Sequence, residues 1–139
     1  MSRKVARECA YKLVFEYLFN GSNTDETRTE LLKDKPLTEA DTTYIDAVLR
    51  GMDEHYGEIY AFVSEFTGNF NIERMFKPDL AVLILAVYEM KYMDDIPLSV
   101  SINEAVELIK NYSTEASSKY VNGVLGAIYK NLTGDKSNG

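Results

Sequence analysis

The sequence predicts an all-α fold, a small bundle in two halves. Apolar residues recur at three- and four-residue spacing through most of the chain, and turn-forming residues separate these stretches. No segment shows a convincing strand pattern. Apolar residues make up 45% of the 139 residues, which is enough for one domain with a real core. We expect a single domain over residues 1–133 and a disordered polar tail over residues 134–139.

Two helices are expected in the first 35 residues. The first, over residues 3–19, has a single apolar face and stops at the turn sequence of residues 20–23. A short polar helix follows at about residues 24–34, with Asn23 or Thr24 as its cap.

A long third helix is expected to begin at residues 38–41. This Thr-Glu-Ala-Asp sequence resembles a capping box in which Asp stands where Glu is more usual. The apolar stripe then keeps helical period almost to Gly68, which suits a C-cap, with a bend expected near Gly51 or Gly57. A short helical turn is expected within residues 70–75.

The second half of the chain predicts three more helices. The fourth, about residues 78–93, is apolar nearly all round and should be the central buried helix of its half. Pro78 fits its first position, and Asp79 favours the positive end of the helix dipole. The fifth and sixth helices are expected at about residues 99–111 and 115–132.

Composition argues against an enzyme, a metalloprotein and a membrane protein. One cysteine, Cys9, and one histidine, His55, provide neither an internal disulfide nor a zinc site. The chain has no glycine-rich phosphate loop, and no apolar run approaches the ~20 residues of a membrane span. We therefore expect a cytoplasmic protein without catalytic residues, metal or cofactor.

A basic cluster at the start of the first helix stands out in a chain of net charge −7. Arg3, Lys4 and Arg7 oppose the helix dipole there, so helix stability does not explain them. They form either a solubilising terminus or a patch that contacts phosphates. Lys119 and Tyr120 place a cation beside a ring on the sixth helix, where core packing is the stronger explanation for the ring.

Four separate segments resemble the NusB family of antitermination factors. Near the C-terminus these are residues 97–110 (Pro-x-x-Val-x-Ile-Asn-Glu-Ala-Val-Glu-Leu-x-Lys) and residues 118–125 (Ser-Lys-Tyr-Val-Asn-Gly-Val-Leu). Residues 3–10 (Arg-x-x-Ala-Arg-Glu-Cys-Ala) and 85–90 (Leu-Ala-Val-Tyr-Glu-Met) agree as well. The likeness covers about residues 3–130, in order and with the family's spacing.

The resemblance implies a NusB-like helical bundle of two three-helix halves and a non-enzymatic, RNA-binding role. NusB proteins bind single-stranded boxA RNA of ribosomal RNA leaders together with NusE, a small-subunit ribosomal protein. With other Nus factors they help assemble an antitermination complex on RNA polymerase. Relatives occur as monomers and as dimers, so a homodimer is among the expected assemblies. A similar domain begins some rRNA cytosine methyltransferases, but the length of this chain favours the stand-alone factor.

Carried over by position, the resemblance implies an RNA face made of Arg3, Lys4, Arg7, Lys119 and Tyr120. Cations that follow phosphates and rings that stack on exposed bases suit single-stranded RNA.

The resemblance also implies a NusE-facing surface that contains Glu73 and Asp79. A negative surface there would suit a basic ribosomal partner, and it gives the acidic balance of the chain one use.

The polar residues of the C-terminal segments that define the resemblance have two interpretations. Asn103, Glu104, Asn122 and Gly123 are either site residues or parts of a helix junction. We favour the junction, in which Asn and Glu satisfy backbone groups or each other and Gly123 permits a close helix approach.

Two other functions remain as alternatives. The net charge and the thin basic patch are compatible with a protein-interaction or homodimer module that has weak or lost RNA binding. A small hydrolase that uses Cys9 or His55 has the least support.

Overall fold

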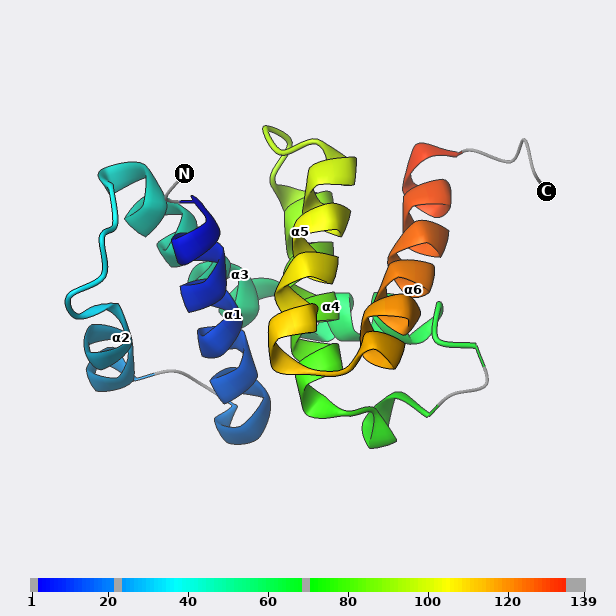
Figure 1. The fold of residues 1–139 in the computed structure, drawn as a ribbon, viewed down its shortest axis with the longest axis horizontal. Coiled ribbons are helices and arrows are strands. Elements are labelled where there is room, and N and C mark those ends of the chain that lie inside the picture. The colour runs from blue at the N-terminus through cyan, green and yellow to red at the C-terminus, as the bar shows by residue number, and fades with distance from the viewer. Residues whose placement is uncertain (1–2, 22–23, 69–70, 135–139) are drawn as a thin grey trace. The chain divides into compact units, whose positions relative to one another are not determined.

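The computed structural model describes residues 3–21, 24–68 and 71–134, and within these ranges the only regular secondary structure is helical, as predicted (Figure 1). The chain divides into two compact units, residues 1–57 and 58–139, and a long helix continues from one into the other. In chain order, the elements are α1 (Arg3–Asn20), α2 (Asp25–Leu32), α3 (Glu39–Ser64), the 3₁₀ helix η1 (Ile72–Arg74), α4 (Lys77–Tyr92), α5 (Leu98–Tyr112) and α6 (Glu115–Thr133).

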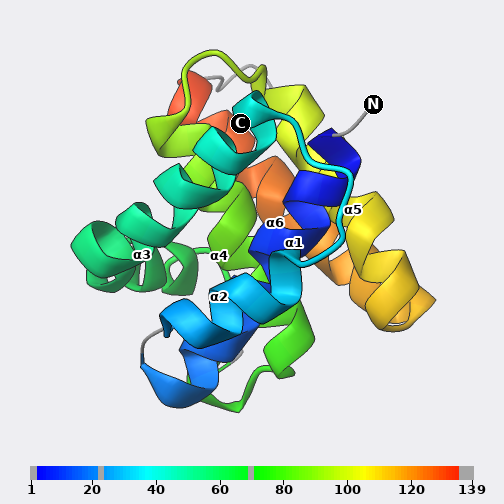
Figure 2. The same cartoon turned by 90° about the vertical axis from the view of Figure 1, so that its left-hand side faces the viewer.

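In the first unit, local capping and one ion pair organise the short helices. The Thr24 hydroxyl accepts a hydrogen bond from the Thr27 N–H at 3.0 Å, which confirms Thr24 as the cap of α2. This short helix contacts α1 (Figure 2), and an ion pair between Arg28 and Asp46 joins it to α3. Because α2 has no buried residue, these contacts rather than a core stabilise its position.

The start of α3 confirms the predicted capping box with aspartate. The Thr38 N–H donates to Asp41 Oδ2 at 3.0 Å, and the Asp41 N–H donates to Thr38 Oγ1 at 3.1 Å. Two N–H groups that have no partner within the helix are thereby satisfied.

The end of α3 corrects the prediction that the helix continues almost to Gly68, with Gly68 as its C-cap. The helix ends at Ser64, because the next N–H groups bond three residues back: Glu65 to the Phe62 carbonyl and Phe66 to the Val63 carbonyl. Gly68 has φ +67° and lies in the turn beyond the helix rather than at its cap. The 3₁₀ helix η1 confirms the short turn expected within residues 70–75.

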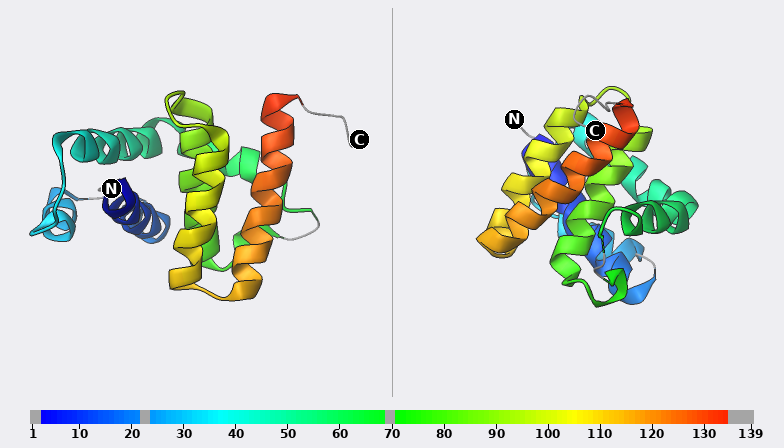
Figure 3. Two further views of the ribbon diagram at one scale, coloured as in Figure 1. Left: turned by 45° about the horizontal axis from the view of Figure 1, so that its top comes forward. Right: turned by 90° about the vertical axis from the view of Figure 1, so that its right-hand side faces the viewer.

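In the second unit, α4 is the central buried helix, as predicted. Every residue from 79 to 90 is buried. Both α5 and α6 contact α4 and also contact each other (Figure 3). The helix begins at Lys77, one residue before the predicted start, so Pro78 occupies its second position. This position is tolerated, because the first four N–H groups of a helix have no partner within it.

One buried hydrogen bond links α4 to α5. Glu89 is 1% exposed, and its Oε1 accepts a hydrogen bond from Ser101 Oγ at 2.8 Å. A carboxylate in an apolar core is costly unless it is paired, so this contact favours one register of α5 on α4.

The end of α6 corrects the predicted tail at its first residue. Gly134 has φ +71°, and its N–H lies within bonding reach of the Asn131 and Lys130 carbonyls, so it caps α6. Glycine adopts this left-handed conformation without a steric cost. The rest of the predicted tail, residues 135–139, lies outside the described residues. No helix of the described ranges is both long and apolar enough to span a membrane.

Replacing Ser101 with alanine tests the α4–α5 hydrogen bond. We expect Ser101→Ala to lower the free energy of unfolding by about 1–3 kcal/mol, because a buried Glu89 oxygen loses its hydroxyl donor. Urea denaturation followed by circular dichroism measures this change. The control is Ser99→Ala, an exposed serine on the same helix, with an expected change within about 0.5 kcal/mol. Equal effects of the two substitutions would contradict the assignment.

Candidate nucleic-acid interface

The predicted basic cluster lies on the first turns of α1, but its three members differ in exposure. Lys4 is exposed, whereas the Arg3 side chain lies outside the described part of the structure. Arg7 is only 5% exposed, and its guanidinium carbon lies 5.7 Å from the centre of the Tyr44 ring on α3. This distance is within the range of a cation–π contact. Arg7 therefore packs inside the first unit, and the structure gives less support to its predicted phosphate contact than to that of Lys4.

The predicted pair on α6 is also divided between surface and interior. Lys119 is exposed, and among the described residues it makes no ion pair. Tyr120 is half-buried, and its hydroxyl oxygen is buried. Burial raises the pKa of Tyr120, and the negative charge of Asp79 raises it further. The phenol end of Tyr120 thus faces the interior, so any base stacking would involve only the rest of the ring.

Asp79, predicted to contact a partner, is buried at the start of α4. Asp79 is 7% exposed, and its Oδ2 accepts a hydrogen bond from Ser117 Oγ at 3.0 Å. Ser117 in turn accepts a hydrogen bond from Ser113 Oγ at 2.8 Å. These contacts tie the start of α4 to the α5–α6 junction. In this conformation Asp79 offers little surface to a partner protein.

The electrostatics of Asp79 follow from this burial. Burial raises the pKa of the Asp79 carboxyl group, while hydrogen bonds from Ser117 and Ser113 oppose the shift. Its Oδ1 atom is buried and has no hydrogen-bond partner among the residues that the structure describes. The charged form of Asp79 is therefore less favourable in the folded protein than in water.

Glu73, the other predicted partner residue, is exposed in η1. Asn71 caps this turn by accepting a hydrogen bond from the Glu73 N–H at 2.9 Å. Phe76, which directly precedes α4, is 56% exposed. The structure thus presents an acidic side chain and an aromatic ring on the segment before α4.

The structure corrects the helix-junction interpretation for three residues of the C-terminal segments. Asn103, Asn122 and Gly123 are all exposed. A Cβ atom added at Gly123 would meet no atom within 4 Å, so this glycine does not serve a close helix approach. Glu104 is half-buried, and the junction interpretation stays open for it alone.

The residues that join α5 and α6 to α4 were not predicted from the sequence. They are Ser101, which bonds Glu89, and Ser117, which bonds Asp79. A signal was present for Ser101, because it falls one turn before Ala105 on the buried stripe of α5.

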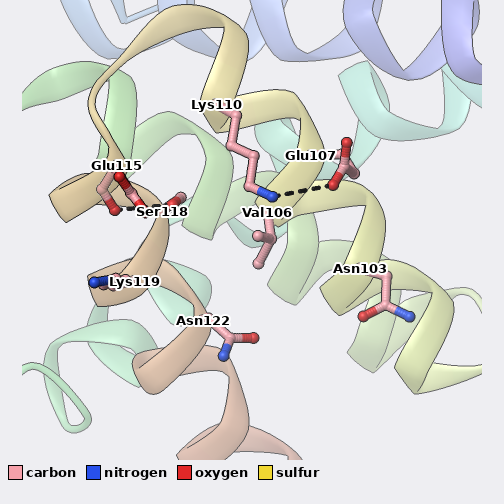
Figure 4. Close-up of a pocket in the computed structure, with 8 residues that line it drawn as sticks. All are labelled: Asn103, Val106, Glu107, Lys110, Glu115, Ser118, Lys119 and Asn122. Carbon is pink, nitrogen blue, oxygen red and sulfur yellow. Dashed lines mark hydrogen bonds and ion pairs between the residues drawn. The ribbon is translucent and has the colours of Figure 1, made fainter.

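A groove with a volume of about 390 Å³ lies on the surface between α5 and α6 (Figure 4). A second groove of about 380 Å³ shares two residues with it, Asn103 and Asn122. The first is lined by Asn103, Val106, Glu107, Lys110, Glu115, Ser118, Lys119 and Asn122. Lys119 thus belongs both to the predicted RNA face and to this groove.

The described residues give the hydrolase alternative no activated nucleophile. Burial raises the pKa of the Cys9 thiol, although Lys35 and Lys12 oppose the shift. His55 is half-buried and lies 3.8 Å from Glu54. No group of three or more His, Cys, Asp or Glu side chains in the described ranges is arranged to hold a metal ion.

Comparison with known proteins identifies the family. Residues 4–130 match the model of the NusB family. The chain belongs to this family. The transcription antitermination protein NusB of Acetivibrio thermocellus is 41% identical over 130 residues, which cover 94% of this chain and 90% of that protein. NusB of Natranaerobius thermophilus is 39% identical over 135 residues, which cover 95% of this chain and 97% of that protein.

Solved NusB structures share the fold. The structure of T. maritima NusB has a TM-score of 0.83 and 32% identity, and the match covers 94% of this chain and 92% of that one. A second match is a chain in the crystal structure of the antitermination factors NusB and NusE in complex with double-stranded RNA. It has a TM-score of 0.81 and 27% identity, and the match covers 92% of this chain and 96% of that one. As a member of this family, the chain is a transcription antitermination protein and not an enzyme.

Replacing Asp79 with asparagine tests the cost of the buried charge. Because folding raises the pKa of Asp79, the folded state binds the proton more tightly than the unfolded state. The free energy of unfolding of the unmodified protein should therefore fall as pH rises from the ordinary pKa of aspartate through the raised folded value. Asp79→Asn should lack this component, so its stability relative to the unmodified protein should rise through that window and level off above it.

Urea denaturation at a series of values between about pH 3 and pH 7 measures this difference. Asp94→Asn, which alters an exposed aspartate, is the control and should follow the unmodified protein. A parallel decline of Asp79→Asn and the unmodified protein would show that burial does not disfavour the charge.

Replacing Gly123 with alanine tests the correction at this position. We expect Gly123→Ala to raise the free energy of unfolding by about 0.5–1 kcal/mol, because alanine loses less backbone freedom in a helix and its methyl group meets open space. Thermal or urea denaturation measures the change. Destabilisation would instead support the close helix approach.

Proposed function

We propose that this protein is an RNA-binding antitermination factor. It binds boxA-type RNA of ribosomal RNA leaders together with NusE, and with other Nus factors it helps assemble an antitermination complex on RNA polymerase. The main support is the family match along almost the whole chain, joined to a related chain solved with NusE and RNA. The absence of an activated nucleophile in the described residues is consistent with a binding role.

Local cations, rather than net charge, support RNA binding. The chain has a net charge of −7, so it does not attract nucleic acid as a whole. Lys4 in the first unit and Lys119 in the second are exposed and suited to phosphate contacts. Arg3 starts the same helix as Lys4, while Arg7 contributes chiefly by packing against Tyr44.

The proposed NusE contact rests on the segment before α4. Glu73 and Phe76 are exposed there, and an acidic side chain beside an aromatic ring suits a basic protein partner. Asp79 contributes indirectly in this proposal, by fixing the start of α4 through its hydrogen bond to Ser117.

A double lysine substitution tests the RNA contact. Lys4→Ala combined with Lys119→Ala should weaken binding to a boxA-type RNA and reduce the slope of log K against log salt by about 1.4, because each lost phosphate contact removes roughly 0.7. Fluorescence anisotropy over about 50–200 mM salt, with NusE present, measures both quantities. Arg7→Ala is unsuitable here, since losing the contact with Tyr44 would also affect folding.

The control for this experiment is Lys33→Ala with Arg50→Ala. It removes two exposed cations outside the proposed face, so overall charge changes equally. Equal salt slopes for the two double variants would contradict the proposed contacts. Equal and weak binding of boxA-type, scrambled and double-stranded RNA, with and without NusE, would instead favour the interaction or homodimer module.

A further inference from the structure

Two asparagines on neighbouring helices line one surface groove. Asn103 lies on α5 and Asn122 on α6, and each lines both of the grooves described between these helices. Both side chains are exposed, and among the described residues neither amide group makes a hydrogen bond within the protein. In Figure 4, the Asn122 side chain extends from α6 toward α5. The groove therefore offers two unused amide groups, each of which can donate and accept hydrogen bonds.

The charges that line the first groove, of about 390 Å³, cancel. Lys110 and Lys119 contribute two positive charges, and Glu107 and Glu115 two negative ones. Lys110 is paired with Glu107 at 3.3 Å, which leaves Lys119 as a cation without an ion pair in the described part of the chain. A groove whose charges balance in this way suits an uncharged polar group, and Lys119 suits one phosphate beside it.

A nucleobase has the chemistry that this groove can recognise. An asparagine amide forms paired hydrogen bonds with a base edge that presents a donor beside an acceptor. Unpaired bases expose all their edges, which is why sequence-specific RNA recognition targets single strands. The volume of about 390 Å³ falls within the range of about 300–1,000 Å³ that is typical of ligand pockets. Val106, half-buried between the two helices, supplies an apolar contact for the ring.

We propose that the α5–α6 groove holds one unpaired base of the bound RNA. The side-chain amides of Asn103 and Asn122 bind the base edge, and Lys119 binds the adjoining phosphate. This inference rests on the proposed RNA-binding function and adds to it the residues that determine sequence preference. A peptide could also use the two amides, but Lys119 connects the groove to the proposed phosphate contacts and therefore favours RNA.

An abasic scan tests this proposal. The probe is a single-stranded boxA-type RNA in which one nucleotide at a time lacks its base, so that every phosphate remains. With the unmodified protein and NusE, one abasic position should weaken binding about tenfold. The double variant Asn103→Ala with Asn122→Ala should bind the intact RNA more weakly by a similar factor. Its affinity for that abasic RNA should be no lower than its affinity for the intact RNA. Such non-additivity shows that the base and the amides interact.

Two exposed asparagines on the same helices provide the matched control. Asn111→Ala on α5 with Asn131→Ala on α6 removes two amides that the groove does not include, and this variant should keep the full abasic penalty. Circular dichroism and urea denaturation verify that both double variants fold. The salt slope should be unchanged by the Asn103 and Asn122 substitutions, because no phosphate contact is lost.

The outcomes separate this inference from the proposed function. The base-binding groove is overturned if Asn103→Ala with Asn122→Ala binds intact RNA as tightly as the unmodified protein does. It is also overturned if this variant shows the same abasic penalties as the unmodified protein. Either result leaves the proposed RNA binding through Lys4 and Lys119 intact. Loss of NusE binding without loss of RNA binding overturns it too and assigns the groove to a protein. No RNA binding by the unmodified protein would overturn both proposals.

Discussion

The second unit depends on the burial of α4, a helix without a polar face. Because every residue from 79 to 90 is buried, α5 and α6 must cover this helix. Two acidic residues are buried with it, and each takes a hydroxyl donor from a covering helix: Ser101 for Glu89 and Ser117 for Asp79. Apolar burial supplies the driving force, whereas these directional bonds favour one alignment of the helices.

On α5 and α6, the groups that stabilise the fold are distinct from the groups that we propose to bind RNA. The hydroxyl groups of Ser101 and Ser117 donate hydrogen bonds to the buried acidic residues of α4. Asn103, Asn122 and Lys119 instead lie on the surface. Asp79 connects the two roles, because the same carboxylate that accepts from Ser117 also raises the pKa of Tyr120 beside Lys119. A change at the start of α4 can therefore reach the proposed RNA contacts through the first turn of α6.

Local features were predictable from the sequence, and long-range pairs were not. The capping box of Thr38 and Asp41 and the buried α4 depend on neighbouring residues or on periodicity. The burial of Arg7 over a ring 37 positions away, like the bond between Asp79 and Ser117, depends on packing that a single sequence does not specify. Helical periodicity does place Asn103 on the face opposite Ser101 and Ala105, so its exposure could be predicted from the sequence. Its place in the family motif favoured a structural role instead.

The acidic balance of the chain constrains the proposed recognition of RNA. With a net charge of −7 and few exposed cations on the proposed face, phosphate contacts can supply only a small, salt-sensitive part of the affinity. Contacts to bases and to a partner protein must then supply the rest, and hydrogen bonds to bases add affinity with little dependence on salt. The amides of the α5–α6 groove meet this requirement, because they add hydrogen bonds without adding charge. Low electrostatic attraction therefore favours binding that depends on base identity over binding to any RNA of sufficient charge.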